Sequence, residues 1–474
     1  MEQGRPTERG DAMAAQPRVR KNLDSLTPQE LADYQHAISK LLEISTSDPQ
    51  SIDGYTYFEQ LHDGELGPCE HGNDTFMPWH RAHLFLFEEA LRRSDPPRTE
   101  NVTVPYWDWS ALPSGKRYPK AFEDQSSVLF HEFRNDTPIC RTDGASGCDS
   151  LPFPRAELDA RVLSIARWST PDRQQSHLTF GGHQGGEQDC SSQFGLGFGA
   201  LEQPAHNTMH DGYIGGDMAQ PSFAALDPIF FSFHCYLDLL WAQWQEKFDT
   251  DTDLDARLCG LFKDREHLPE NRFRVKDTLD TKTQLGYVYQ YTPGEAAPTR
   301  PGVAATPPFP AHPAFDFVVS ARKKPELVRT IDITIPQPGV DGAHLQLTGV
   351  NVTTPFSYSA DIYLTSAGEE LRLEDREFRA THLADLLYFW QAHHGGGDRR
   401  THDLTVDLGL ALKSLAETHA GEQWRVSVAL GASQTPPRPH HGEHEHAHAH
   451  GAAAHQPVDL AATMNFGDLT LKVY

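Results

Sequence analysis

Residues 62–80, HDGELGPCEHGNDTFMPWH, and residues 206–234, which begin HNTMH and end DPIFFSFH, decide the fold of this chain. Imidazole is a ligand that copper and zinc share. Dinuclear metal sites are also built from side chains on facing helices of a bundle. The two stretches therefore predict a pair of metal ions held between helices, three histidines to each ion. The first three are His62, His71 and His80, and the second three are His206, His210 and His234.

The residues around these stretches predict four helices. Thr27, Pro28 and Glu30 have the pattern of a capping box with a proline in the first turn. Asp227 followed by Pro228 is a similar start for a later helix. Four helices are expected. The first begins after Thr27, and the second runs from near Pro78 to Pro96. The third carries His206 and His210, and the fourth begins after Asp227.

The histidine spacing constrains the metal. His206 and His210 are four residues apart, so one helix face would present both rings. Zinc proteases also use such a pair, but there a glutamate follows the first histidine, and here Asn207 takes that place. His62 and His71 are expected to approach the site from the loop before the second helix.

The composition changes after Tyr291. Residues 293–313 hold many Pro and Ala residues, which is typical of a linker. Residues 440–455 include seven histidines and are expected to form a flexible surface loop. Beyond the linker, alternating apolar residues predict the strands of an antiparallel β-sandwich. The expected strands cover residues 328–335, 344–350, 362–364, 404–412, 424–430 and 469–473.

These patterns together predict an α+β multidomain fold. A mainly α, four-helix-bundle catalytic domain with long loops is followed by an antiparallel β-sandwich domain. The expected divisions are an N-terminal arm at 1–20, the catalytic domain at 21–292, the linker at 293–313, and a C-terminal domain at 314–474 with its His-rich loop at 440–455.

Charge and hydropathy exclude several classes of partner. The formal net charge is −25 with neutral histidines, so nucleic acid and anionic membrane surfaces are poor partners. No apolar run reaches membrane-spanning length. Residues 1–20 are polar and show no secretion signal, so we expect a cytoplasmic protein, although export with a partner would leave no mark. Six cysteines do not indicate a disulfide framework, although Cys140 and Cys148 are close enough to bridge a small loop.

Several motifs, in order along residues 18–291, resemble those of the tyrosinase and polyphenol oxidase family of type 3 copper proteins. Relatives in this family often carry a C-terminal covering domain, which fits the second domain expected here. The matching segments are CEH (69–71), FMPWHR (76–81), PYWDW (105–109), PAHN (204–207), GGDM (215–218), DPIFF (227–231) and YVY (287–289).

The resemblance implies two copper ions, with O2 as co-substrate and small phenols as substrates. His62, His71 and His80 would bind one copper ion. His206, His210 and His234 would bind the other. His62 lies only nine residues before His71, a shorter loop than is usual in the family, so His36 is the alternative ligand. His83 is expected to be a second-shell or surface histidine. A copper-delivery partner is possible, and the oligomeric state is not predicted.

Three residues near the ligands have more than one expected role. Cys69 would either form a thioether to His71, as in fungal relatives with this spacing, or remain a buried thiol. Phe230 is expected to stack over the site, and it would also pack in the core. Asp238 would either fix the tautomer of a nearby histidine or form a salt bridge.

The resemblance also implies a proton acceptor for the substrate. In the family, a glutamate and an asparagine at the positions of Glu202 and Asn207 hold a water that helps to deprotonate a monophenol. A free phenol has a pKa near 10, so hydroxylation at neutral pH needs such help. Asp211 is expected to be either a further base at the mouth of the site or a solvated helix charge.

The C-terminal domain would make the enzyme latent by placing a side chain in the entrance. Phe356 and Tyr358 are the candidates for this plug, and an ordinary stabilising domain is the alternative. The His-rich loop would either capture copper for delivery or have no function.

The predicted function is copper-dependent oxidation of phenols by O2, including ortho-hydroxylation of monophenols and oxidation of o-diphenols to o-quinones. The alternatives are a strict catechol or o-aminophenol oxidase, a haemocyanin-like O2-binding protein, and a copper storage or delivery protein.

Overall fold

The structure is a computed structural model of the chain. The residues that it describes are 16–63, 69–111, 118–132, 134, 155, 158–159, 162–171, 173–185, 197–207, 209–219, 221–248, 250, 256–291, 327–339, 343–352, 358–372, 381–388, 402–432, 464–465 and 468–473.

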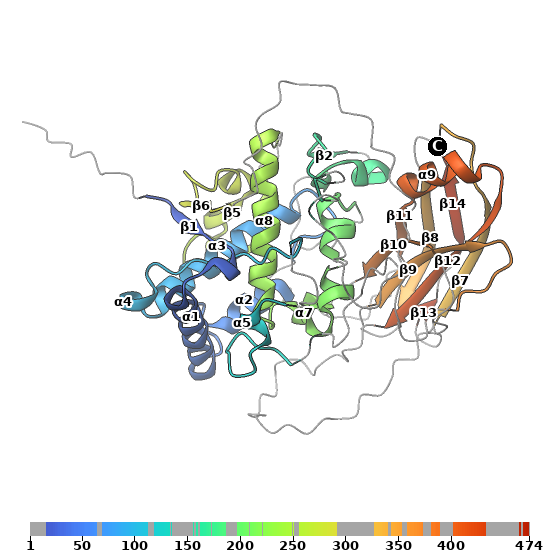
Figure 1. Ribbon diagram of the computed structural model, residues 1–474. Helices are drawn as coiled ribbons and strands as arrows, with labels where there is room; N and C mark the ends of the chain where they lie inside the picture. Colours follow the sequence, from blue (N-terminus) through green and yellow to red (C-terminus); the bar gives the residue numbers. More distant parts are fainter. Residues whose placement is uncertain are drawn as a thin grey trace, which may run out of the picture.

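A helical part comes first along the chain and a β-rich part follows it (Figure 1). Within the helical part, α3 packs against α1, α2 and α8. The four longest helices of this part are α1 (Pro28–Ser47), α2 (Tyr55–Asp63), α3 (Phe76–Ser94) and α8 (Ile229–Lys247). The short α-helices are α4 (Pro96–Thr99), α5 (Lys120–Glu123) and α7 (Pro221–Ala224), and the short 3₁₀-helices are η1 (Leu23–Ser25), η2 (Arg173–Leu178), η5 (Gly216–Ala219), η6 (Pro269–Asn271) and η7 (Val275–Thr278).

The ends of the long helices follow the sequence patterns. The Thr27 hydroxyl accepts a hydrogen bond from the Glu30 amide, and the Glu30 carboxylate accepts one from the Thr27 amide, which confirms the capping box of α1. Helix α3 ends at Ser94, just before the Pro96-Pro97 pair. The Asp227 carboxylate accepts from the Ile229 amide at the start of α8.

Two expectations for the helices were wrong. His62 lies in α2 rather than in a loop. The helix expected to carry His206 and His210 is instead two π-helical turns, η3 (Leu201–His206) and η4 (Met209–Ile214). Gln203 is extended within η3, because the proline that follows it disfavours the helical conformation.

Short strands tie distant parts of the helical part together. Strand β1 (Arg18–Arg20), at the end of the expected N-terminal arm, pairs in parallel with β6 (Tyr287–Tyr289). The two other short pairs are β2 (Ser169–Thr170) with β3 (Gly182–His183), and β4 (Arg257–Phe262) with β5 (Arg272–Arg274).

The β-rich part contains two antiparallel sheets, as expected for a β-sandwich. In the first sheet, Ile362 and Leu364 lie opposite Val428 and Val426, and all four side chains are buried. The first sheet has the order β10 (Thr381–Tyr388), β9 (Tyr358–Ser366), β12 (Gln423–Ala432), β7 (Leu327–Thr334). In the second, β8 (Ala343–Val352) pairs with β11 (His402–Asp407), β13 (Met464–Asn465) and β14 (Leu469–Val473).

The strand expected at residues 404–412 was wrong in its second half, because helix α9 (Gly409–His419) begins there. Leu408, Leu412, Leu415 and Ala416 are buried at helical spacing, and a short apolar run does not distinguish helix from strand. Strand β10 was not predicted.

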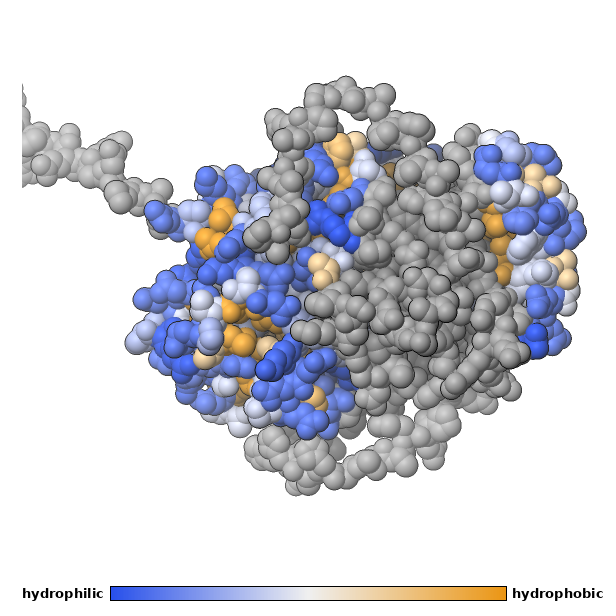
Figure 2. Space-filling view, viewed as in Figure 1, coloured by the Kyte–Doolittle hydropathy of each residue, from blue (hydrophilic) through white to orange (hydrophobic). Residues whose placement is uncertain are grey.

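Hydrophilic residues cover most of the described surface in Figure 2. None of the described helices is long and apolar enough to cross a membrane. Strand β10 lies against η3, so the β-rich part contacts the helical part beside one of the two histidine stretches.

Candidate metal centre

The six histidines of the two stretches meet inside the helical part, and all six are buried. The ring centroids of the first three lie 5.0–5.6 Å apart, and those of the second three lie 4.4–5.4 Å apart. His80 of α3 and His234 of α8 stack almost in parallel, 4.4 Å apart, where the two groups meet. His36 instead lies 2.8 Å from the Asp95 carboxylate at the junction of α1 and α4, so the alternative ligand is not part of this cluster.

Backbone carbonyls orient two of the rings. Nδ1 of His80 lies 2.9 Å from the Phe76 carbonyl oxygen, and Nδ1 of His210 lies 2.7 Å from that of Met218. A carbonyl only accepts, so each Nδ1 must donate, and Nε2 keeps a lone pair for a metal. The amide oxygen of Asn207 lies 2.7 Å from Nδ1 of His206 and orients that ring in the same way.

The nitrogen atoms that point inward fit a metal. Among the described residues, Nε2 of His80, Nε2 of His206 and Nδ1 of His234 are buried without a hydrogen-bond partner. Nε2 of His210 lies 3.2 Å from Nε2 of His234. The ligand atoms of His206, His210 and His234 all lie within 4.8 Å of one another. An unpaired buried nitrogen is costly, and a shared metal ion would satisfy several of them at once.

The rings are held in the neutral form that binds metals. Burial lowers the pKa of His71, His80 and His234 well below its usual value, and neighbouring histidines lower it further. Burial likewise lowers the pKa of His206 well below its usual value and that of His210 to about 3. Neutral imidazole is the ligand form, so no proton has to leave before a metal binds at neutral pH.

Phenylalanines close the sides of the cluster. The Phe230 ring is 4.3 Å from the His234 ring and 4.6 Å from the His62 ring, and it is also part of the buried core. The Phe233 ring is 4.9 Å from that of His210. The Phe76 ring is 4.6 Å from His80 and 4.8 Å from His206. These contacts place Phe230 in the core and beside both histidine groups, edge-on to His62 and tilted to His234, and its stacking over the site stays a prediction.

Cys69 and His83 lie beside the first histidine group. Cys69 is buried and its sulfur is 3.4 Å from Nδ1 of His71, the ring that it was expected to link. His83 is buried, and its Nε2 lies 3.0 Å from the Phe58 carbonyl oxygen. Because Phe58 is one turn before His62 in α2, His83 supports the ligand-bearing helix from behind, in agreement with a second-shell role.

Glu202 is buried in η3 next to the first histidine group. Both of its carboxylate oxygens accept from the amide of Gly72, at 2.9 and 3.0 Å. Burial raises the pKa of Glu202 well above its usual value, although the Gly72 amide partly offsets this effect. The amide nitrogen of Asn207 is buried and has no hydrogen-bond partner among the described residues. Asp211 lies in η4, but its side chain is outside the described residues.

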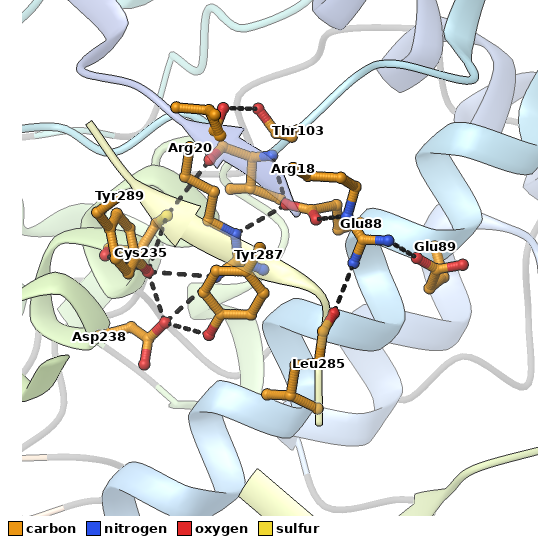
Figure 3. A network of polar contacts seen from close by, with 12 residues as sticks. Arg18, Arg20, Glu88, Glu89, Thr103, Cys235, Asp238, Leu285, Tyr287 and Tyr289 are labelled. Atoms are coloured by element: carbon orange, nitrogen blue, oxygen red, sulfur yellow. Dashed lines mark hydrogen bonds and ion pairs between the residues drawn. The ribbon is translucent and has the colours of Figure 1, made fainter. Parts of the chain in front are cut away.

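A second buried polar cluster lies on the same two long helices (Figure 3). The Asp238 carboxylate pairs with Arg81 and with Arg20, and it accepts from the Tyr287 and Tyr289 hydroxyls. Of the two roles expected for Asp238, the geometry matches the salt bridge. The sequence patterns did not identify its partners, which come from β1, α3 and β6.

The sequence patterns also did not identify two residues between the expected second and third helices, His131 and Arg134. His131 Nε2 lies 2.8 Å from the Asp217 carboxylate. Arg134 forms a two-pronged ion pair with Asp227, at 2.6 and 2.7 Å. Both aspartates belong to matched motifs, GGDM and DPIFF, but no spacing in the sequence indicates which cations meet them.

Some expected features fall outside the described residues. Phe356, the linker at 293–313 and the His-rich loop at 440–455 are outside them. Tyr358 begins β9, and its side chain is outside them as well.

Comparisons with known proteins found similarity to tyrosinases and polyphenol oxidases. Residues 50–247 match the family model described as the common central domain of tyrosinase. The chain is 30% identical over 251 residues to the chloroplastic polyphenol oxidase of Malus domestica, which covers 49% of this chain and 40% of that protein. It is 27% identical over 366 residues to tyrosinase HcTyr1 of Hahella sp. (strain CCB-MM4), covering 68% of this chain and 73% of that protein.

A solved structure shows the same fold. Latent aurone synthase, a polyphenol oxidase, superposes with a TM-score of 0.55 over 97% of this chain and 90% of its own, at 16% identity. The chain thus spans less than half of the Malus domestica protein but most of the aurone synthase structure.

Proposed function

Because this chain carries a tyrosinase-family domain, we propose that it is a copper enzyme that oxidises phenols with O2. The observation that supports this most directly is the convergence of six buried imidazoles, of which His80, His206 and His234 each have a nitrogen without a hydrogen-bond partner among the described residues. Such a cluster is costly unless metal ions occupy it. Imidazole is a ligand that suits copper.

The two ligand sets follow the two stretches of sequence. His62, His71 and His80 would hold one copper ion, with His62 supplied by α2 and His80 by α3. The other ion would be held by His206 of η3, His210 of η4 and His234 of α8. When bound, the copper pair supplies the electron transfer between the phenol and O2.

Glu202 is proposed to receive the phenol proton. The Gly72 amide holds its carboxylate next to His71, and the residue is four positions before His206. A base works best when its pKa lies near the operating pH, and the raised pKa of Glu202 shifts it from its usual range in that direction. Asn207 offers a buried NH2 group without a partner among the described residues, which can hold a water molecule between the two side chains.

Phe230 is proposed to position the substrate ring. Its ring lies against one histidine of each group, His62 and His234. An aromatic face at this place can stack with a phenol, at an offset or edge-on. The same residue limits water around the reacting atoms, because it is fully buried.

The C-terminal β-sandwich is proposed to restrict access to this site. The contact between β10 and η3 supports this, because η3 carries Glu202 and His206. Cleavage in the linker at 293–313, followed by removal of the C-terminal part, is expected to increase the rate of catechol oxidation. An unchanged rate after clean removal would argue for a purely stabilising domain.

The test of the proposed function is copper reconstitution followed by O2-uptake assays on tyrosine, catechol and o-aminophenol. We expect uptake with catechol and with tyrosine. Uptake with catechol or o-aminophenol but not with tyrosine would indicate a strict diphenol or aminophenol oxidase. Reversible O2 binding without uptake would indicate a haemocyanin-like protein, and copper binding without either would indicate storage or delivery.

A further inference from the structure

The segment from Tyr118 to Arg134 lies against the second histidine group. Its Tyr118 hydroxyl lies 3.4 Å from the carbonyl oxygens of Tyr213 and Ile214, at the end of η4. Near its other end are the two cations His131 and Arg134, which the proposed mechanism does not use. Each of them reaches an aspartate that stands beside an element of the second group.

We propose that His131 and Arg134 position the second histidine group: His131 holds η5 through Asp217, and Arg134 holds the start of α8 through Asp227. This inference rests on the proposed function, because it assigns these two cations a role in copper binding by His210 and His234.

The contact of His131 acts on His210 through one peptide unit. His131 Nε2 lies 2.8 Å from the Asp217 carboxylate, which is buried. The next residue, Met218, places its carbonyl oxygen 2.7 Å from Nδ1 of His210. The turn that presents this carbonyl follows Gly215 and Gly216, both in the left-handed region with φ of 62° and 59°. Backbone hydrogen bonds such as that from the Met218 amide to the Gly215 carbonyl hold this turn, and the contact at Asp217 further fixes where the Met218 carbonyl lies.

The contact of Arg134 acts on the first turn of α8. Both guanidinium-to-carboxylate contacts to Asp227 are short, at 2.6 and 2.7 Å, and neither side chain is more than slightly exposed. Asp227 also accepts from the Ile229 amide at 3.0 Å, which caps the helix that carries His234. Arg134 is itself held, because it donates to the carbonyl oxygens of Phe122 and Leu129 at 2.7 and 3.0 Å. A two-pronged pair of this kind fixes orientation as well as distance.

The arrangement predicts an effect that is specific to one copper ion. Asp217 belongs to η5, which lies behind His210. Asp227 stands at the start of α8, which carries His234. The first group is carried by α2, by α3 and by the turn before α3. Loss of His131 or Arg134 should therefore weaken the second ion and spare the first.

The test measures copper(II) binding to each group by itself in the full chain. The second group is measured in a chain with His80→Asn, and the first in a chain with His210→Asn. His131→Gln is added to each; it keeps a hydrogen-bond donor for Asp217 and replaces the imidazole ring, whose pKa is lowered by burial but raised overall by Asp227 and Asp217. We expect the dissociation constant of the second group to rise about tenfold and that of the first to change less than about twofold, as for outer-shell partners of metal ligands. Arg134→Gln should raise the dissociation constant of the second group more, up to about a hundredfold.

The chain offers a matched control. His36 Nε2 also lies 2.8 Å from an aspartate carboxylate, that of Asp95, away from the histidine cluster. His36→Gln should change neither dissociation constant. Circular dichroism of the metal-free chains shows whether each variant folds, and His131→Gln keeps the test valid if Arg134→Gln does not fold.

The outcomes separate this inference from the proposed function. Equal increases at both groups, or no increase at the second, would overturn the positioning role alone. The proposed function and this inference would both be overturned if the chain without either substitution, His131→Gln or Arg134→Gln, binds no copper at either group.

Discussion

Helices α3 and α8 carry two buried polar clusters that differ in one respect. On α3, His80 and Arg81 are neighbours, and on α8, His234 and Asp238 are one turn apart. In the histidine cluster, Nε2 of His80 and Nδ1 of His234 have no hydrogen-bond partner among the described residues. The Asp238 carboxylate instead accepts from Arg20, Tyr287 and Tyr289 (Figure 3) and also from Arg81.

The difference indicates which cluster is structural and which awaits a ligand. Burial raises the pKa of Asp238, but Arg81 and Arg20 outweigh that effect and hold it below its usual value. Arg20 also pairs with Glu88 at 2.8 Å, so the second cluster joins β1 to both helices. Its carboxylate is paired without any added group, although Nη2 of Arg20 and Nη2 of Arg81 are buried without a hydrogen-bond partner among the described residues. The histidine cluster becomes complete only when metal ions satisfy its inward nitrogens.

Removing a histidine ligand should have the largest effect on activity. We expect His234→Asn to lower the rate of catechol oxidation by on the order of a thousandfold or more, because one copper ion loses a ligand. The free energy of unfolding of the metal-free chain should change less, because Nδ1 of His234 has no hydrogen-bond partner among the described residues and Nε2 contacts only another histidine nitrogen, that of His210. Copper content, O2 uptake and urea unfolding measure the three quantities. A variant that keeps two copper ions and full activity would contradict the ligand assignment.

Removing the carboxylate of the second cluster should have the opposite pattern. Asp238→Asn leaves Arg81 buried without this counter-charge and leaves Arg20 paired with Glu88, and we expect the metal-free chain to lose about 3–5 kcal/mol of unfolding free energy. Urea unfolding followed by fluorescence measures this loss. As a control, Asp332→Asn removes an exposed ion pair with Arg425 and should leave unfolding unchanged. Equal stabilities of the Asp238 and Asp332 variants would remove the distinction between the two clusters.

Glu202→Gln tests the proton acceptor within the histidine cluster. We expect the rate of monophenol hydroxylation to fall by about a hundredfold, while the rate of catechol oxidation falls by less than about threefold, because a general base contributes at this scale. Both rates are measured at saturating substrate with equal copper loading. Equal losses on both substrates would show that Glu202 only supports the structure around Gly72.

The pH dependence of the unfolding free energy should also distinguish the histidine cluster from the Asp238 cluster, by a smaller effect than the substitutions. The pKa of His210 in the folded chain is about 3, against 6.5 when unfolded, so the metal-free chain should lose stability as the pH falls below 6.5. The pKa of Asp238 is lowered from 3.8, so its contribution is present above that value and is lost only at more acidic pH. Unfolding free energies of the metal-free chain and of His210→Asn, measured between pH 7 and about 4, should therefore differ in slope. Parallel curves would argue against buried neutral histidines.

The sequence was sufficient where a local pattern carries the information. The Thr27 capping box, the start of α8 at Asp227 and the six clustered histidines all follow from short motifs. The β-sandwich core follows from alternation, as Ile362 and Leu364 on one strand show.

The sequence was insufficient where long-range contacts decide. Asp238 has partners from residues 20, 81, 287 and 289, and no spacing relates them. The π-helical turns around His206 depend on how Gln203 responds to the following proline. His131 and Arg134 find their aspartates only after the loop that carries them has folded against η5 and α8.

Copper content of the reconstituted chain tests the central claim most directly, and it should be measured after deletion of residues 440–455, so that the His-rich loop cannot bind metal. We predict two copper ions for each chain, falling to one when His80→Asn or His210→Asn is introduced. A deleted chain that binds no copper, or that still binds two copper ions in both variants, would contradict a dinuclear centre at the meeting point of α3 and α8.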